Sequence, residues 1–228
     1  MLKDLNWEYD TNYKFYIVDS IPSTNTYLKE NSDLYSDRTV LIALRQTAGR
    51  GRYDRVWKSD NDIIFSILLK NNGFYQITAP LAVCYGLLDL GFDVSIKWPN
   101  DIYLNGKKLV GILIEDIFRD KFISSVVGIG INLTDKPSFH AAYLNTDISK
   151  YLIIDKILKR FDEFNKKDFN YLMELYKSKS MILGKTVYFH DVEYQAIGID
   201  NQGYLILRND KEEKKISWDE INIKESLR

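Results

Sequence analysis

Three arginines alternate with small residues in the segment 46–57, whose sequence is QTAGRGRYDRVW. Glycine lets the backbone approach a ligand closely, and each guanidinium offers a planar set of donors that matches carboxylate and phosphate oxygens. Such a loop is suited to wrap an anion, and Trp57 at its end offers a flat ring for stacking. A solvated basic turn or an RNA-binding arginine–glycine stretch has the same composition, so this segment alone leaves several functions open.

Three further motifs lie in the middle of the chain. The sequence KWPND covers residues 97–101, GILIE covers residues 111–115, and GIGIN covers residues 128–132. STN at residues 23–25 precedes them all. Lys97 is expected at the end of a strand.

Together, these motifs resemble those of the biotin protein ligases, in order and in spacing, over roughly residues 1–135. The remainder agrees more loosely, because that family ends in a small SH3-like barrel. The resemblance implies an ATP-dependent, AMP-forming ligase that makes biotinyl-AMP. It also implies transfer of biotin to a lysine of a biotin carboxyl carrier domain, in acetyl-CoA carboxylase or a related carboxylase.

The resemblance also implies site residues. Biotin would be bound by Ser23, Thr24, Asn25, Gln46, Gly49, Arg50, Gly51, Arg52, Lys97, Gly111, Gly128 and Gly130. ATP would be bound by Arg52, Arg55, Trp57, Lys97 and Asn132, and the catalytic residues would be Lys97, Arg52 and Arg50. No metal would be held by protein ligands, since Mg²⁺ would enter on the ATP phosphates. Asp101 is the candidate for orienting the acceptor lysine.

The sequence departs from the family in two places. Some members place a tyrosine beside biotin in the strand after the arginine loop, where this chain has Ile64, so we expect a more apolar pocket wall. Some relatives carry an N-terminal helix-turn-helix domain, and Ser23 comes too early to leave room for one, so we expect no DNA binding. The resemblance is also compatible with a homodimer formed through an exposed sheet edge.

Composition narrows the class of protein. Lysine plus arginine (31) nearly balances aspartate plus glutamate (32), which gives no general affinity for nucleic acid or membranes. The single cysteine, Cys84, lies in an apolar segment, and the two histidines, His140 and His190, are far apart. A disulfide framework, a zinc site and a histidine triad are therefore disfavoured. A single cysteine suits a reducing compartment, so we expect a cytoplasmic protein. Because no apolar stretch reaches the roughly 20 residues that span a bilayer, we expect neither secretion nor membrane insertion.

Hydrophobic periodicity predicts an α+β fold with a mixed or antiparallel sheet and helices on one side. Strands are expected at 14–18, 39–44, 63–69, 94–97, 108–116 and 122–133, and helices at 26–31, 78–89, 149–164 and 168–177. Short runs at 186–189, 193–199, 204–207, 215–218 and 221–223 predict a small barrel. We therefore expect a catalytic domain at residues 1–180 and an SH3-like domain at residues 181–228.

Two rival functions remain at this point. A lipoate or octanoate protein ligase shares the expected fold, although this combination of motifs is not expected of it, and competition between substrates separates the two. A non-catalytic nucleic-acid-binding module built on the barrel and the arginine loop is disfavoured by the near-zero net charge. Steep salt-dependent RNA binding without use of ATP would favour that module.

Overall fold

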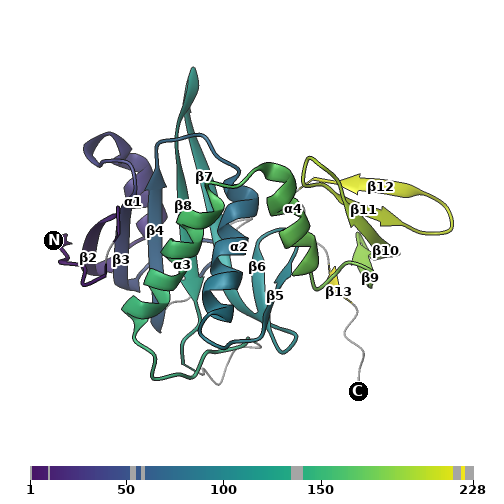
Figure 1. Cartoon of the computed structure of the whole chain (residues 1–228), viewed down its shortest axis with the longest axis horizontal. Coiled ribbons are helices and arrows are strands. Elements are labelled where there is room, and N and C mark those ends of the chain that lie inside the picture. Colours follow the sequence, from purple (N-terminus) through teal and green to yellow (C-terminus); the bar gives the residue numbers. More distant parts are fainter. Residues whose placement is uncertain are drawn as a thin grey trace.

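An eight-stranded sheet forms the larger part of the protein in a computed structural model that describes residues 2–9, 11–51, 55–57, 60–134, 141–217 and 222–223 (Figure 1). Strands β2 and β3 are parallel, and the other neighbours are antiparallel. The strands, in spatial order, are β1 (Lys3–Asp4), β2 (Lys14–Ile21), β3 (Thr39–Gln46), β4 (Asp60–Leu69), β8 (Lys121–Ile131), β7 (Lys107–Arg119), β6 (Asp101–Leu104) and β5 (Val94–Lys97).

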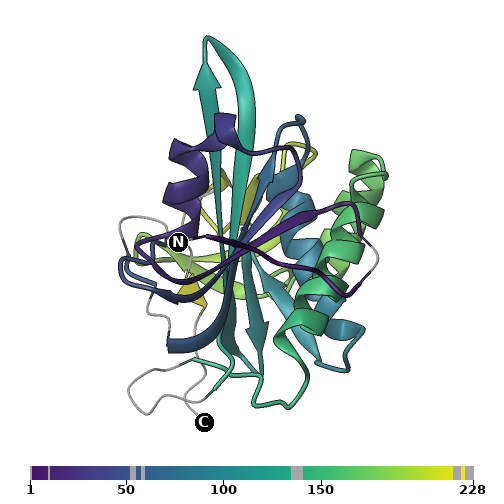
Figure 2. The same ribbon diagram turned by 90° about the vertical axis from the view of Figure 1, so that its left-hand side faces the viewer.

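Helices cover both faces of this sheet (Figure 2). On one face lie α2 (Tyr75–Leu88), α3 (Lys150–Phe164) and α4 (Phe169–Ser178), and on the other lies α1 (Thr24–Glu30), which is followed by a short 3₁₀ helix (Ser32–Leu34). Leu28 of α1 packs in a separate buried cluster with Leu41, Leu68 and Val126. The expectation of helices on one side was therefore wrong. These strand residues alternate with those that face α2, so the sheet has a second apolar face that another helix must bury.

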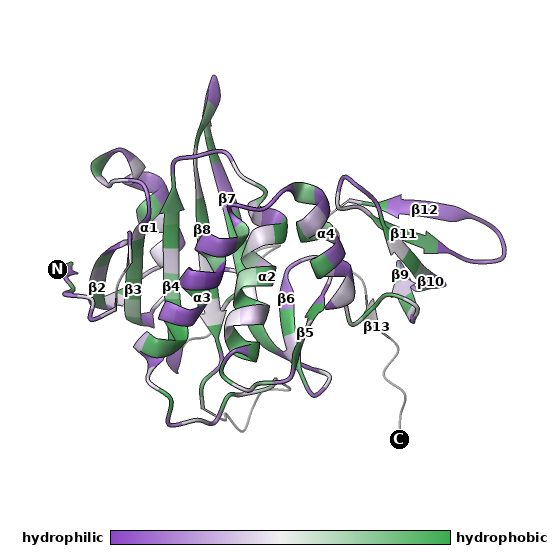
Figure 3. Cartoon of the chain, in the orientation of Figure 1, coloured by the Kyte–Doolittle hydropathy of each residue, from purple (hydrophilic) through white to green (hydrophobic). Residues whose placement is uncertain are grey.

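The helices begin where side chains satisfy their free N–H groups. Ser23 accepts from the N–H of Thr26, Ser149 from that of Tyr151, and Asp168 from that of Tyr171. Helix α2 is buried on nearly all sides because it lies between the sheet, α3 and α4. In contrast, α3 has a polar outer face (Figure 3).

A second sheet of five antiparallel strands follows α4. Its order is β12 (Glu213–Ile216), β11 (Leu205–Arg208), β10 (Val192–Ile199), β9 (Thr186–Phe189) and β13 (Asn222–Ile223). The sheet fits the expected SH3-like unit, although within the described part of the chain no pairing of β12 with β13 closes it into a barrel. Its buried residues, such as Tyr194 and Leu205, continue the main hydrophobic core.

Most of the expected elements are present, with shifted ends. β5 and β9 have the predicted bounds, but α2 begins at Tyr75 rather than at residue 78, and Pro80 lies inside it. The extra turn buries Tyr75 and Ile77. β6 was not predicted as a strand, because four residues between two turns give too little periodicity. Asn105 and Gly106 form the expected tight turn after it, with φ of 51° and 75°.

Candidate functional site

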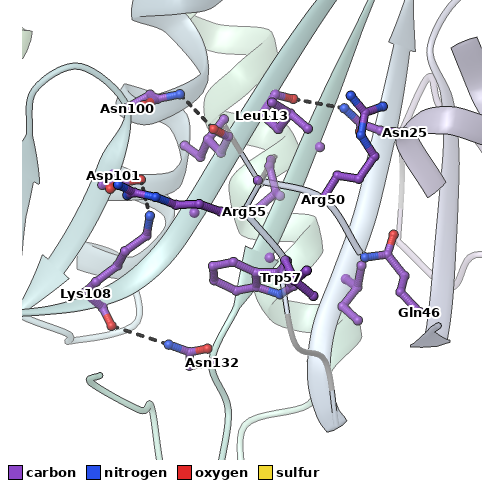
Figure 4. Close-up of a pocket in the computed structure, with 18 of the residues that line it drawn as sticks. Asn25, Gln46, Arg50, Arg55, Trp57, Asn100, Asp101, Lys108, Leu113 and Asn132 are labelled. Carbon is purple, nitrogen blue, oxygen red and sulfur yellow. Dashed lines mark hydrogen bonds and ion pairs between the residues drawn. The ribbon is translucent and has the colours of Figure 1, made fainter. Parts of the chain in front are cut away.

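A cavity of about 310 Å³ lies on the α1 face of the large sheet. The register explains its position, because Ile64, Ser66 and Leu68 of β4 lie opposite Gly130, Gly128 and Val126 of β8. These positions alternate with the core face, so they all point toward α1. Gln46, the described residues of the arginine loop and the turn after β5 form the remaining walls (Figure 4).

One end of the cavity is a connected set of buried, uncharged polar groups from α1, β3 and β4. Gln46 Oε1 accepts from the Thr24 backbone N–H at 2.7 Å and lies 3.0 Å from Thr24 Oγ1. The Thr24 hydroxyl lies 2.7 Å from Ser66 Oγ, which in turn donates to Asn25 Oδ1 at 2.7 Å. Thr24, Asn25 and Ser66 are almost fully buried, so their hydrogen bonds fix a rigid polar end.

Glu115 connects this polar end to the arginine loop. Its carboxylate accepts from Asn25 Nδ2 at 3.1 Å, from Lys29 Nζ at 3.0 Å and from Arg50 at 3.4 Å. Burial raises the pKa of Glu115, but the hydrogen bonds from Lys29 and Asn25 and the charge of Arg50 outweigh burial, and the net pKa lies below its usual value. Glu115 is therefore ionised at neutral pH.

Glycines make the cavity floor flat. A Cβ on Gly130 would lie 2.5 Å from the Trp57 ring, and one on Gly111 would lie 2.7 Å from it. Gly111 and Gly130 are cross-strand partners, so the indole rests on bare backbone. A Cβ on Gly128 would lie 2.2 Å from Asn25 Oδ1. The three glycines thus admit Trp57 and Asn25 as well as any ligand between them.

The loop that carries Arg50 and Trp57 folds back on itself. Gly51 donates its N–H to Arg55 O at 2.7 Å, and Trp57 donates to Gly49 O at 2.9 Å. Gly49 lies so close to Trp57 that a Cβ there would come within 2.4 Å of the Trp57 carbonyl oxygen. Arg50 points toward Asn25, whereas Arg55 points toward Asp101 at the opposite end (Figure 4).

Cationic side chains collect at that opposite end. Lys97, the last residue of β5, donates from Nζ to Tyr103 OH at 3.4 Å and faces the Tyr103 ring. Lys108 forms an ion pair of 2.7 Å with Asp101, and Asn132 donates to the Lys108 carbonyl at 3.4 Å. Lys97 and Lys108 line the cavity at this end together with Arg55, so this end is suited to bind anions.

Buried contacts hold the turn after Lys97. The peptide bond between Trp98 and Pro99 is cis. Trp98 Nε1 donates to Gly203 O at 3.1 Å, Tyr176 OH donates to Pro99 O at 2.5 Å, and Asn100 Nδ2 donates to Ile112 O at 2.7 Å. Burial, together with the charge of Asp101, raises the pKa of Tyr176 well above its usual value, so it remains a donor.

The structure brings most of the predicted site residues together. Those that line the cavity are Ser23, Thr24, Asn25, Gln46, Arg50, Gly51, Arg55, Trp57, Lys97, Asp101, Gly111, Gly128, Gly130 and Asn132. Gly49 lies beside Gln46 Nε2 and Trp57, whereas Arg52 and His140 fall outside the described residues. Ile64 also lines the cavity, at the position where some family members have tyrosine.

Sequence reasoning gave no role to Ser66 or Glu115. Ser66 is the one hydroxyl in the otherwise apolar run 63–69, which is the only local signal that it offers. Glu115 closes the GILIE motif, but its contact with Asn25 spans 90 residues and cannot be inferred from spacing.

Other candidate chemistries find little support in the structure. Burial raises the pKa of Cys84 to about 12, so its thiol stays protonated and is a poor nucleophile. Within the described ranges, no group of three or more His, Cys, Asp or Glu side chains could hold a metal ion. Within the same ranges, no helix is long and apolar enough to cross a membrane.

Comparisons with known proteins agree with this arrangement. The profile of the biotin/lipoate A/B protein ligase family matches residues 17–132. Bifunctional ligase/repressor BirA of Bacillus subtilis is 33% identical over 215 residues, covering 81% of this chain and 66% of the relative. Biotin–protein ligase 2 of Arabidopsis thaliana is 27% identical over 225 residues, covering 83% of this chain and 68% of the relative. The chain thus spans about two thirds of the length of these curated relatives.

A solved structure extends the comparison to the whole fold. The biotin protein ligase from Aquifex aeolicus in complex with biotin and ATP has a TM-score of 0.81 at 28% identity, and the match covers 93% of this chain and 100% of that one. Because the family profile spans just over half of the chain and contains the cavity floor, the polar end and the Lys97 turn, this chain belongs to the biotin/lipoate A/B protein ligase family.

Proposed function

We propose that this protein is an ATP-dependent biotin protein ligase, which forms biotinyl-AMP and transfers biotin to a lysine of a biotin carboxyl carrier domain. The observation that carries the proposal is the composition of this cavity. It joins a buried, uncharged polar end at Thr24, Asn25 and Gln46 to a cationic end at Lys97 and Lys108. The groups of biotin follow the same order as those of the cavity, from an uncharged ureido head through an apolar chain to a carboxylate.

The wall between the two ends suits the apolar part of biotin. Ile64 and Leu113 line the cavity together with the glycine floor. Lipoate has an apolar dithiolane in place of the ureido head, so it would leave the buried polar groups without ligand partners, which is unfavourable. Biotin is therefore the better match within the family.

The cationic end would promote the first step, in which the biotin carboxylate attacks the α-phosphate of ATP and pyrophosphate leaves. Lys97 and Arg50 would reduce the repulsion between the two anions and stabilise the charge that develops on the phosphate. Arg55 would bind the outer phosphates, which carry Mg²⁺ into the site. Trp57 would stack against the adenine, and Asn132 would hydrogen-bond it, with Arg52 as a further phosphate ligand.

The second step needs no protein nucleophile. The amine of the acceptor lysine attacks the carbonyl of the mixed anhydride, an amide bond forms, and AMP leaves. Asp101 lies in the cavity wall and would orient this amine, in competition with its ion pair to Lys108. If this role is right, Asp101→Asn should slow transfer to the acceptor while leaving adenylate formation unchanged. Equal transfer rates would contradict it.

We assign both steps to residues 1–180, because every residue that lines the cavity falls between Ser23 and Tyr143. Residues 181–228 would form a separate small domain that contacts the site through the Trp98–Gly203 hydrogen bond. A cytoplasmic location fits the proposal, since ATP and carrier domains of carboxylases are found there.

The decisive experiment is intact-mass analysis of an apo carboxyl carrier domain incubated with this protein, Mg-ATP and either biotin or lipoate. A gain of one biotin that requires ATP and is lost in Lys97→Ala would support the proposal. Lys107→Ala is the matched control, because Lys107 is exposed and does not line the cavity. A gain with lipoate alone would favour the other ligase of the family, and a gain with neither would count against both.

A further inference from the structure

Lys97 lies between two residues whose side chains belong to the hydrophobic core. Ile96 and Trp98 are almost fully buried, whereas Lys97 is half-buried and lines the cavity. This alternation follows from the extended backbone at the end of β5, where successive side chains point to opposite faces of the sheet. The position of the Lys97 side chain therefore depends on how its two buried neighbours are held.

The segment that leads from α4 to the second sheet holds the first of these neighbours. The Ile96 N–H donates to Lys179 O at 2.8 Å, and the Met181 N–H donates to Ile96 O at 2.8 Å. Ile96 and Ser180 thus form a parallel bridge along the outer edge of β5. Figure 1 shows the second sheet on this side of the large sheet.

The second neighbour, Trp98, is held by the second sheet itself. Its Nε1 donates to Gly203 O at 3.1 Å in a buried contact. Gly203 lies in the turn between β10 and β11 and has a φ of 85°, a value that favours glycine. Because a buried carbonyl is costly to leave without a donor, this hydrogen bond fixes Trp98 relative to the turn.

Asp200 gives this turn its shape. Its Oδ1 accepts from the N–H of Gln202 at 2.9 Å and from that of Tyr204 at 3.0 Å, and its carbonyl accepts from the Gly203 N–H at 3.0 Å. Such bonds from an aspartate to the backbone two residues on are typical of tight turns. Asp200 therefore presents the Gly203 carbonyl to Trp98, although Asp200 itself does not line the cavity.

We propose that the second sheet positions Lys97 for adenylate formation through the hydrogen bond between Trp98 and Gly203, with Trp98 and Asp200 as positioning residues. The second sheet then has a role in the reaction although it supplies no cavity-lining residue within the described part of the chain. This inference rests on the proposed function, because it takes Lys97 as the residue that brings the biotin carboxylate and the ATP phosphate together.

A small displacement of Lys97 should slow the first step more than the second. In adenylate formation two anions must come within bonding distance, and a misplacement of about 1 Å at such a site can cost up to about 100-fold in rate. In the transfer step the two groups are already joined, so the reaction depends less on Lys97. The two steps can therefore be compared within one variant.

The test follows both steps in Trp98→Phe, which keeps an aromatic ring in the core but removes the N–H. Release of pyrophosphate measures adenylate formation, and the intact mass of an apo carrier domain supplied with synthetic biotinyl-AMP measures transfer. We expect adenylate formation to slow about tenfold, with the KM for biotin and for ATP changed by less than about twofold. Transfer from biotinyl-AMP should stay within about twofold of wild type.

A second set of variants lies outside the cavity. Asp200→Ala removes the side chain that shapes the turn, so adenylate formation should slow about threefold, again without a change in transfer. Asp200→Asn keeps an oxygen for the two backbone N–H groups but loses the 3.0 Å ion pair with Lys215, and it should restore most of the rate. Asp210→Ala is the matched control, because Asp210 is exposed in the next turn of the same sheet.

The inference is overturned if Trp98→Phe and Asp200→Ala both form the adenylate at the wild-type rate. It is also overturned if both steps slow in proportion, since a folding defect lowers the active fraction in both assays. Should Trp98→Phe fail to fold, Asp200→Ala and Asp200→Asn give the answer on their own. A wild-type protein that forms no adenylate from biotin would overturn the proposed function itself, and that result appears before any substitution is made.

Discussion

The two ends of the cavity are built in different ways. The polar end lies on regular elements, α1, β3 and β4, and its side chains are buried and bonded to one another. The cationic end combines Arg55 of the arginine loop with Lys97 at the end of β5 and Lys108 near the start of β7, and these side chains are at least partly exposed. The side chains of the first end are bonded to one another, whereas the second end carries an excess of positive charge.

This difference suggests that the two ends of the cavity have different roles, one in binding and one in catalysis. A rigid, neutral end recognises a head group by shape and hydrogen bonds, and therefore governs affinity and selectivity. A cationic end stabilises the negative charge that develops in the transition state, and therefore governs the rate of the reaction. Substitutions at the two ends should consequently separate in their effects on binding and on turnover.

The largest effect is expected at the cationic end. Lys97→Met should lower the rate of adenylate formation by about 100- to 1,000-fold, because it removes a charge that stabilises the transition state. Biotin affinity should change by less than about threefold, which pyrophosphate release and calorimetry would show together. A variant that lost biotin binding but kept its turnover rate would break the division between the two ends.

Two glycines of one strand offer a sharper comparison. In Gly128→Ala the new Cβ would lie 2.2 Å from Asn25 Oδ1, and in Gly130→Ala it would lie 2.5 Å from the Trp57 ring. Each clash should cost about 1–3 kcal/mol, which corresponds to about 5- to 150-fold in affinity. We expect Gly128→Ala to weaken biotin and Gly130→Ala to weaken ATP.

Calorimetric titration of both ligands against both variants measures this pair. Gly198→Ala in the second sheet is the control, because its Cβ would make an ordinary contact of 3.7 Å with Ile206. Equal losses for both ligands in both variants would mean that the two ends are not independent.

Sequence reasoning recovered the positions of the site better than their connections. The described residues of the motifs at 23–25, 46–57, 97–101 and 128–132 do converge on one cavity, because each motif lies at the end of a strand or on the strand face that lines the cavity. The helix start at Ser23 follows from local chemistry, since a hydroxyl at that position caps free N–H groups.

The parts that sequence could not supply depend on register. Gly111 and Gly130 were expected to leave room for a ligand, and it is only their cross-strand pairing that shows how Trp57 occupies the same surface. Likewise, Ser66 enters the polar end because β4 and β8 pair it with Gly128. Helix α1 lies opposite α2 because it buries the apolar face of the sheet that α2 leaves uncovered. That face is formed by several strands together, so no single segment of the sequence reveals it.

A smaller effect should distinguish the two ends by ionic strength. Raising the salt concentration from 0.05 to 0.5 M, a range of roughly threefold in Debye length, screens exposed charges far more than buried neutral groups. The KM for ATP should rise by about threefold, whereas the dissociation constant of biotin should stay nearly constant. Steady-state kinetics and titration at both salt concentrations test this, and parallel changes for the two ligands would contradict it.

The smallest effect concerns Glu115, which joins the two ends through Asn25 and Arg50. Its pKa is lowered in the folded protein, so its ionised form contributes stability above the ordinary value of 4.5, and this is lost as the pH falls through the folded pKa. Glu115→Gln should therefore lower the melting temperature by about 2 °C at pH 7. Thermal melts should show that this difference in melting temperature becomes smaller below pH 4.5. A difference that became larger on acidification would mean that Glu115 does not stabilise the protein as an anion.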